Sequence, residues 1–138
     1  MFIVIVGSGR TGSLLAGSLS RSGHEVVVVE KNAASFSMLP VDFSGFQIEG
    51  NAMENEVLKK AKIESADLIV VTTGNDQVNY LITQIAKQNF DVPRIMVRTI
   101  NPYVEDMYKN DDRVEIFSQI SLLVDNIIKK IDQEGMGL

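Results

Sequence analysis

The stretch that decides the fold is residues 1–30, MFIVIVGSGRTGSLLAGSLSRSGHEVVVVE. Its apolar run at residues 2–6 predicts a strand, and the glycine-rich turn at residues 7–12 leads into a helix over residues 10–21. Residues 25–30 are rich in valine, which is typical of a strand buried on both faces of a parallel sheet. The stretch therefore predicts the first strand–helix–strand unit of a dinucleotide-binding fold.

The turn carries a complete G-x-G-x-x-G motif. It is formed by Gly7, Ser8, Gly9, Arg10, Thr11 and Gly12. In such a motif the glycines permit a tight turn, a close approach of the backbone to a pyrophosphate, and close packing of the helix on the strand. The helix that begins here directs unpaired N–H groups and its positive dipole end toward a bound phosphate. With its flanking strand and helix, the motif predicts an adenine nucleotide or dinucleotide site.

Glu30 ends the second strand about 20 residues after the glycine turn, where a ribose-binding acid is expected. A carboxylate there pairs with a 2′,3′-diol and repels a 2′-phosphate, which favours NAD or an adenosine nucleotide over NADP. Lys31 beside it weakens this preference and joins the candidate site. The alternative for Glu30 is an ordinary solvated acid at the end of a strand.

The composition fits one globular domain, because 138 residues with 45% apolar content can bury a core. A formal net charge of −5 argues against nucleic-acid binding and against docking on an anionic membrane. The chain has no cysteine and a single histidine, so thiolate chemistry and a histidine metal cluster are not expected. No apolar run approaches the roughly 18 residues of a membrane span, so we expect a cytoplasmic protein that does not itself insert into the membrane.

Strands and helices continue to alternate along the rest of the chain. Further strands are expected at residues 46–49, 68–72, 94–99 and 114–117, and helices at residues 32–40, at 53–62, from residue 76, after Asn101-Pro102 and at 118–132. The fold class is therefore α/β, a Rossmann-like doubly wound six-stranded parallel sheet in the order 3-2-1-4-5-6 with helices on both faces. The nucleotide-binding domain is expected to span residues 1–132, and residues 133–138 to form a disordered tail.

Right-handed crossovers place every strand-to-helix loop at one edge of such a sheet. Besides the glycine turn and Glu30, this edge should carry Gly50, Asn51, Ala52, Thr73, Gly74, Asn75, Asp76 and Thr99. Two pairs also look like capping boxes: Asn51 with Glu54, and Thr73 with Asp76. Capping and ligand contact are compatible, because the loops lie at the switch point where ligands bind.

Two polar residues in the second half of the chain have more than one possible role. Asn79 lies one turn into the helix that begins near residue 76, and it is either a ligand contact or part of a solvated face. Arg98 alternates with apolar Ile95 and Val97 near the end of the fifth strand. A charge on a buried strand needs a partner, so we expect a phosphate, an acid or a neighbouring subunit beside Arg98.

The last expected helix has a wide apolar stripe. It consists of Ile120, Leu122, Leu123, Val124, Ile127, Ile128 and Ile131. Part of the stripe is expected to pack on the sheet. Its width favours a further contact with another subunit or domain.

These marks together resemble one known family. They are the glycine turn with arginine at its fourth position, Glu30, Gly50-Asn51-Ala52, Ser65-Ala66-Asp67, Asp76 with Asn79, and Arg98. The set is similar to the KTN domain, also called the RCK or TrkA N-terminal domain, of potassium transporters and channels. The resemblance covers residues 1 to about 131.

The resemblance implies a cytoplasmic, non-enzymatic subunit that lies at the inner face of the membrane, binds NAD(H) or ATP/ADP, and gates a membrane potassium transporter or channel. It also implies a homodimer, with an octameric ring as the larger assembly. The family's contacts carry over to the turn at residues 7–12, Glu30, Asn51 with Ala52, Thr73 with Gly74, and Arg98. Two departures are Asn51, where the family usually has aspartate, and the lack of a C-terminal lobe after the last helix.

Regulation is therefore the leading hypothesis, with Arg10 and Arg98 as the residues that sense phosphate charge. The alternative is the NAD-binding fragment of a dehydrogenase without its catalytic domain. A weaker one is a redox-sensing interaction domain with a soluble partner. Arg10 and the apolar last helix favour regulation, because hydride transfer needs neither.

Overall fold

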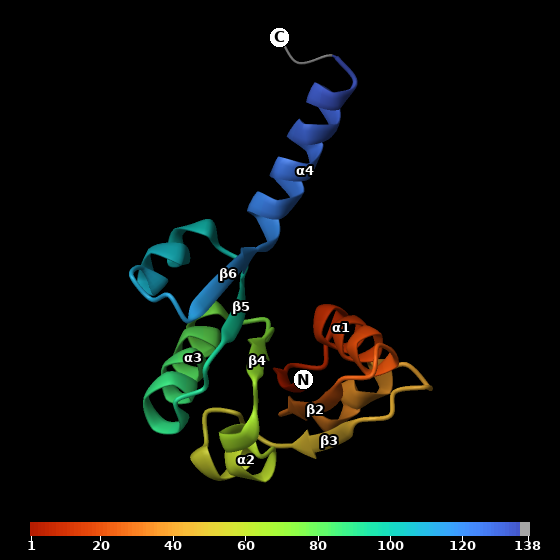
Figure 1. The fold of residues 1–138 in the computed structure, drawn as a ribbon, viewed down its shortest axis with the longest axis vertical. Coiled ribbons are helices and arrows are strands. Elements are labelled where there is room, and N and C mark those ends of the chain that lie inside the picture. The colour runs from red at the N-terminus through yellow and green to blue at the C-terminus, as the bar shows by residue number, and fades with distance from the viewer. Residues whose placement is uncertain (136–138) are drawn as a thin grey trace.

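The computed structural model describes residues 1–135 and contains one six-stranded sheet. Its strands are β1 (Phe2–Val6), β2 (Glu25–Glu30), β3 (Phe46–Glu49), β4 (Leu68–Val71), β5 (Ile95–Thr99) and β6 (Val114–Ser118). All neighbouring strands are parallel, and their order is β3-β2-β1-β4-β5-β6 (Figure 1). The predicted fold class and strand order are confirmed.

Helices cover both faces of the sheet. The α-helices are α1 (Arg10–Arg21), α2 (Asn55–Lys60), α3 (Asp76–Phe90) and α4 (Gln119–Gln133), and the 3-10 helices are η1 (Ala33–Met38), η2 (Ile63–Ser65) and η3 (Pro102–Tyr108). Successive strand residues point to opposite faces, so β1 directs Ile3 and Ile5 toward α1. It directs Val4 and Val6 toward the core shared with α2 and α3. Both sets are buried, which explains why the central strands have no polar face.

Both predicted capping boxes are wrong. Asn51 Oδ1 accepts from Met53 N–H at 2.9 Å and closes a turn that precedes α2, so this helix begins later than residue 53. At α3 the cap is Asn75, whose Oδ1 accepts from Val78 N–H at 3.0 Å. Asn75 lies directly before the helix, where its side chain reaches the free N–H groups of the first turn.

α4 extends away from the sheet, and none of its residues is buried (Figure 1). The seven residues of its apolar stripe are 43–62% exposed, so the expected packing of part of this stripe on the sheet is wrong. Ser118 is both the last residue of β6 and the N-cap of α4. Because no loop separates strand from helix, the helix continues outward and does not fold back over the sheet.

The predicted domain end lies close to the end of α4. Gln133 is its last helical residue, and Gly135 N–H donates to Asp132 O at 3.1 Å. Of the expected tail, Gln133 belongs to α4 and Glu134 is its C-cap, and residues 136–138 lie outside the described part of the chain. No helix within residues 1–135 is both long and apolar enough to span a membrane.

Candidate nucleotide-binding site

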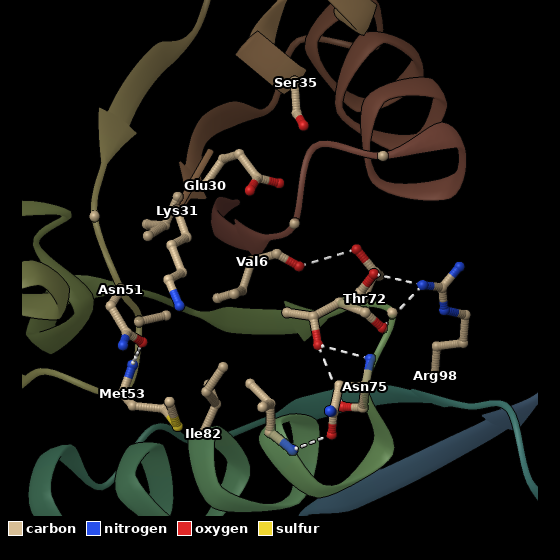
Figure 2. Close-up of a pocket in the computed structure, with 18 residues that line it drawn as sticks. Val6, Glu30, Lys31, Ser35, Asn51, Met53, Thr72, Asn75, Ile82 and Arg98 are labelled. Carbon is tan, nitrogen blue, oxygen red and sulfur yellow. Dashed lines mark hydrogen bonds between the residues drawn. The ribbon is translucent and has the colours of Figure 1, made fainter. Parts of the chain in front are cut away.

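A cleft of about 400 Å³ opens at the carboxyl ends of β1, β2, β3 and β4 (Figure 2). Of the predicted site residues, it is lined by Gly7, Gly9, Glu30, Lys31, Asn51, Ala52, Thr73, Gly74 and Arg98. These residues come from the ends of four strands and the loops after them, and Arg98 comes from a fifth strand, β5. The cleft lies at the switch point of the sheet, the position at which doubly wound folds bind ligands.

The glycine turn requires glycine at two positions, for its backbone conformation at Gly7 and for a close approach of two backbone segments at Gly12. Gly7 has φ +105°, a conformation that few residues with a side chain adopt. A Cβ on Gly12 would lie 2.0 Å from the carbonyl oxygen of Gly7, so only glycine lets α1 begin this close to β1. Gly9 lines the cleft and has open space where a Cβ would be. These features match the tight-turn, backbone-approach and helix-packing positions of a phosphate-binding turn.

Glu30 is fixed by two backbone donors at the edge of the cleft. Its Oε1 accepts from Ser8 N–H and its Oε2 from Asn32 N–H, both at 2.8 Å. The carboxylate is thus half-buried and held in place by the backbone, and its contact with a ribose stays a prediction. Each oxygen keeps a further lone pair, so the same carboxylate can accept from ribose hydroxyl groups.

Six predicted site residues lie outside the cleft lining: Ser8, Arg10, Thr11, Gly12, Asp76 and Asn79. Ser8 is buried and holds Glu30, and Thr11 bonds to Arg98. Asp76 accepts from Ile100 and Asn101 N–H at 2.8 Å each, and so ties α3 to the loop after β5. Arg10 is exposed in the first turn of α1, and its contact with phosphate stays a prediction. Thr99, expected at the edge, is buried beside Ser118 of β6.

Asn79 of α3 holds the loop after β4, and this loop forms one wall of the cleft. It is 0% exposed, so the interpretation of a solvated face is wrong. Its Oδ1 accepts from Thr73 N–H at 3.1 Å and also from the Thr73 hydroxyl, while its Nδ2 donates to the carbonyl oxygens of Thr73 and Arg98. One buried amide therefore joins the loop after β4 to the end of β5.

Replacing Asn79 by aspartate should destabilise the domain by about 2 kcal/mol at neutral pH. The substitution keeps the shape but points a carboxylate oxygen at the two carbonyl oxygens that now accept from Nδ2. Urea unfolding followed by circular dichroism measures the change. Asn89→Asp, an exposed substitution on the same helix, should cost less than about 0.5 kcal/mol. Equal losses in the two variants would contradict the role given to Asn79.

Arg98 lies between the cleft and α1. Its guanidinium donates to the carbonyl oxygens of Thr72 and Thr73, at 2.7 and 2.9 Å, and to the Thr11 hydroxyl at 3.0 Å. Arg98 forms no ion pair with a carboxylate of residues 1–135, so of its expected partners an acid of this part of the chain is not found, and a phosphate or a neighbouring subunit stays a prediction. Burial lowers the pKa of Arg98, and the nearby charge of Asp76 opposes the shift. Carbonyl groups do not neutralise the guanidinium, so its charge remains available to an anion in the cleft.

Several lining residues were not predicted. They are Val6, Val29, Ser35, Met53, Thr72, Val78 and Ile82, whereas Gly50 and Asn75, which were expected at this edge, also line the cleft. Val78 and Ile82 are one turn apart on α3 and belong to an apolar stripe that packs on the sheet. At the start of α3 the same stripe faces the cleft, which gives the site an apolar wall suited to a base. Periodicity alone does not separate these two uses of one stripe.

The TrkA-N domain family model matches residues 3–119. This chain belongs to the TrkA-N domain family. The predicted resemblance is therefore confirmed, and it is supported by a Trk system potassium uptake protein TrkA homolog from Methanothermobacter thermautotrophicus. That protein is 35% identical over 109 residues, which cover 79% of this chain and 50% of the relative. The chain thus spans about half the length of the curated relatives it matches.

Solved structures of TrkA-N and RCK domains share the fold. The TrkA-N domain of the inner membrane protein ybaL from Escherichia coli has a TM-score of 0.82 at 21% identity, covering 94% of this chain and 96% of that one. The GsuK channel bound to NAD has a TM-score of 0.76 at 25% identity, covering 98% of this chain and 24% of that one. GsuK bound to ADP has a TM-score of 0.75 at 25% identity, covering 94% and 33%.

Proposed function

We propose that this chain is the nucleotide-binding domain of a cytoplasmic regulatory subunit that controls a membrane potassium transporter or channel. The observation that carries the proposal is the contact of Glu30 with Ser8 N–H. It joins the ribose-binding acid to the phosphate-binding turn in a TrkA-N domain. The relatives of this domain are Trk potassium uptake proteins, and GsuK is a channel. We place the domain at the inner face of the membrane, held there through its protein partner.

The ligand in this proposal is NAD(H) or ATP/ADP. The GsuK structures with NAD and with ADP support both, because the two ligands share an adenosine diphosphate group. Phosphates lie on the glycine turn in this arrangement, the ribose on Glu30, and the positive charge of Arg98 close to the remaining phosphates. The role is binding and regulation, without catalysis.

The same proposal includes a homodimer, from which a larger ring can be built. α4 exposes its apolar stripe over its whole length. An apolar groove of about 530 Å³ lies beside its base, lined by Leu15 and Leu19 of α1, Met96 of β5 and Phe117 of β6. Leu122 at the base of α4 also lines this groove, and the rest of the α4 stripe extends away from it, so a second copy can bring its stripe against the groove and cover both surfaces.

Arg98 can couple nucleotide binding in the cleft to the arrangement of the subunits. It lines both the cleft and the apolar groove, and it bonds to Thr11 of α1 and to the loop after β4. A nucleotide that changes these bonds favours one arrangement of α1 and the partner helix over another. A ligand shifts such an equilibrium only through different contacts in the two arrangements.

Native mass spectrometry of the purified chain tests the proposal, because it reports bound nucleotide and subunit number together. We expect a dimer or larger ring that binds one adenine nucleotide per chain and changes its distribution of sizes on binding. A monomer whose size is the same with and without NAD or ADP would contradict regulation. That result would favour the alternative of a dehydrogenase fragment.

Replacing Arg10 by alanine tests the predicted sensing of phosphate charge. Titration calorimetry should show about a tenfold loss of ATP affinity and less than a twofold loss for adenosine, since only ATP presents charge to the start of α1. Arg21→Ala removes the same charge from the other end of α1 and is the matched control. Similar losses of affinity for ATP and for adenosine would contradict the role of Arg10 in sensing phosphate charge.

A further inference from the structure

A second pocket, here called the amino-end pocket, lies at the amino ends of β1, β2 and β3, away from the nucleotide cleft. Its volume is about 510 Å³, and it shares no lining residue with the cleft. Its floor is apolar and includes Phe2, Val27, Phe46 and Ile48. Phe46 is 73% exposed, although it is a large aromatic residue on a strand. The pocket therefore presents apolar surface that a partner would bury.

β3 is the last strand at its side of the sheet and, within residues 1–135, pairs with β2 alone (Figure 1). Gly50 N–H donates to Glu30 O at 3.0 Å, so Gly50 faces β2, and alternate residues of a strand face the same neighbour. Gln47 and Glu49 therefore direct their backbone N–H and C=O groups outward. β3 carries neither lysine nor proline, which often protect an edge, so this edge is open to a further strand.

Two lysines lie at the rim of the amino-end pocket, at the end of α2. Lys60 and Lys62 both line it, and neither forms an ion pair with a carboxylate of residues 1–135. Among the lining residues in this part of the chain, Glu25 carries the one negative charge. The rim therefore has a positive excess on a chain whose formal net charge is −5, and it is complementary to an occupant with carboxylates.

Lys62 has a left-handed backbone conformation, with φ 59° and ψ 41°. Glycine is the usual residue where a helix ends in this way, because a side chain is disfavoured there. Asp91 has a similar conformation at the end of α3, and its carboxylate accepts from Arg113 at 2.6 Å. The side chain of Asp91 is thus used within the chain, whereas Lys62 presents its charge at the rim of the pocket.

We propose that the edge of β3 and the amino-end pocket bind an extended acidic segment of a partner protein, which adds a strand to the sheet. The backbone of this segment bonds to Gln47 and Glu49. One of its apolar side chains covers Phe46, and its carboxylates face Lys60 and Lys62. In such strand addition the backbone bonds provide affinity, and the pocket selects the side chains. The site is separate from the nucleotide cleft, so the inference goes beyond the proposed function and does not depend on it.

The probe is the acetylated and amidated peptide TETVTET, in which the valine and both glutamates share one face of a strand. Its sequence is the same in both directions, so it fits a parallel or an antiparallel strand. NMR titration of the ¹⁵N-labelled full chain should show saturable binding with a dissociation constant below about 1 mM. The largest shifts should occur at the amides of Gln47 and Glu49. The matched peptide TKTVTKT should bind at least about tenfold more weakly, because its lysines meet Lys60 and Lys62.

Variants of the chain separate the backbone contacts from the charges. Gln47→Pro removes an outward N–H and leaves the pairing with β2 intact, so it should abolish binding of TETVTET, whereas Gln47→Ala should bind it like the wild type. Lys60→Gln combined with Lys62→Gln should weaken binding about fivefold, while Lys129→Gln, at an exposed lysine of α4, should leave it unchanged. Lys62→Gly should weaken binding and raise the urea midpoint of unfolding, because glycine relieves the left-handed conformation.

Three results would overturn the inference: no saturable binding of TETVTET, equal binding of the two peptides, or shifts that leave the amides of Gln47 and Glu49 unchanged. An oligomer of the free chain that Gln47→Pro dissociates would assign the edge to a second copy and would overturn it as well. The NAD affinity of Gln47→Pro should equal that of the wild type, which shows that the variant is folded. Failure of the wild type to bind NAD would contradict the proposed function and leave this inference standing.

Discussion

Replacing Gly12 by alanine should destabilise the domain by about 3 kcal/mol or more, a large share of the roughly 5–15 kcal/mol of a typical domain. The new Cβ would lie 2.0 Å from the carbonyl oxygen of Gly7 and 2.9 Å from its carbonyl carbon. Both are backbone atoms, so no side-chain rotation relieves the overlap. α1 would have to move away from β1 and disturb the core around Ala16. Urea unfolding followed by circular dichroism measures the loss.

Gly9→Ala provides the control within the same turn. A Cβ on Gly9 meets no atom within 4 Å, and its φ of −80° is open to any residue. The variant should lose less than about 1 kcal/mol of stability, an ordinary cost for alanine at an N-cap. Comparable losses in Gly9→Ala and Gly12→Ala would show that the close approach of α1 to β1 does not explain the need for glycine at residue 12.

Replacing Glu30 by alanine should weaken the binding of NAD or ADP by about 100-fold. In the proposed site the carboxylate accepts from two ribose hydroxyl groups, and a hydrogen bond to a charged group contributes about 1.5–3 kcal/mol. The loss of the contacts with Ser8 and Asn32 N–H also frees the turn that holds the phosphates. Titration calorimetry with both ligands measures the change.

Glu49→Ala is the matched control for this substitution. Glu49 ends the neighbouring strand, pairs with Glu30 in the sheet register and is exposed outside the cleft lining. It removes the same charge from the same edge of the sheet, so it separates a direct contact from a general electrostatic effect. If the two variants weaken binding equally, the ribose contact of Glu30 is wrong.

The sheet could be predicted from the sequence because its signals are local. The apolar runs of β1 and β4 and the valine-rich β2 are long enough to be buried on both faces. The alternation of elements indicates a parallel sheet covered on both faces, and the glycine turn with Glu30 indicates the dinucleotide-binding type, whose strand order is 3-2-1-4-5-6. Residue type does not identify the buried face of α3, because the apolar Leu81 is 49% exposed whereas the polar Asn79 is fully buried. A satisfied polar residue in a core has no signature in hydrophobic periodicity.

The site was predicted as a set of loops, and its internal contacts were not. The sequence places Arg98 at the end of a buried strand, but the carbonyl groups that hold it belong to residues about 25 positions away. The direction of α4 depends on the absence of a loop after Ser118, and this detail decides whether its stripe packs on the sheet. Such features depend on tertiary geometry, so residue types and spacing do not specify them.

The central claim is that the cleft binds a nucleotide with an unphosphorylated ribose on Glu30. Titration calorimetry of the full wild-type chain with NAD and with NADP, under the same conditions, tests it most directly. The account predicts saturable binding of one NAD per chain and at least about tenfold weaker binding of NADP, whose 2′-phosphate meets the Glu30 carboxylate. Equal affinities for NAD and NADP, or no saturable binding of NAD, would contradict it.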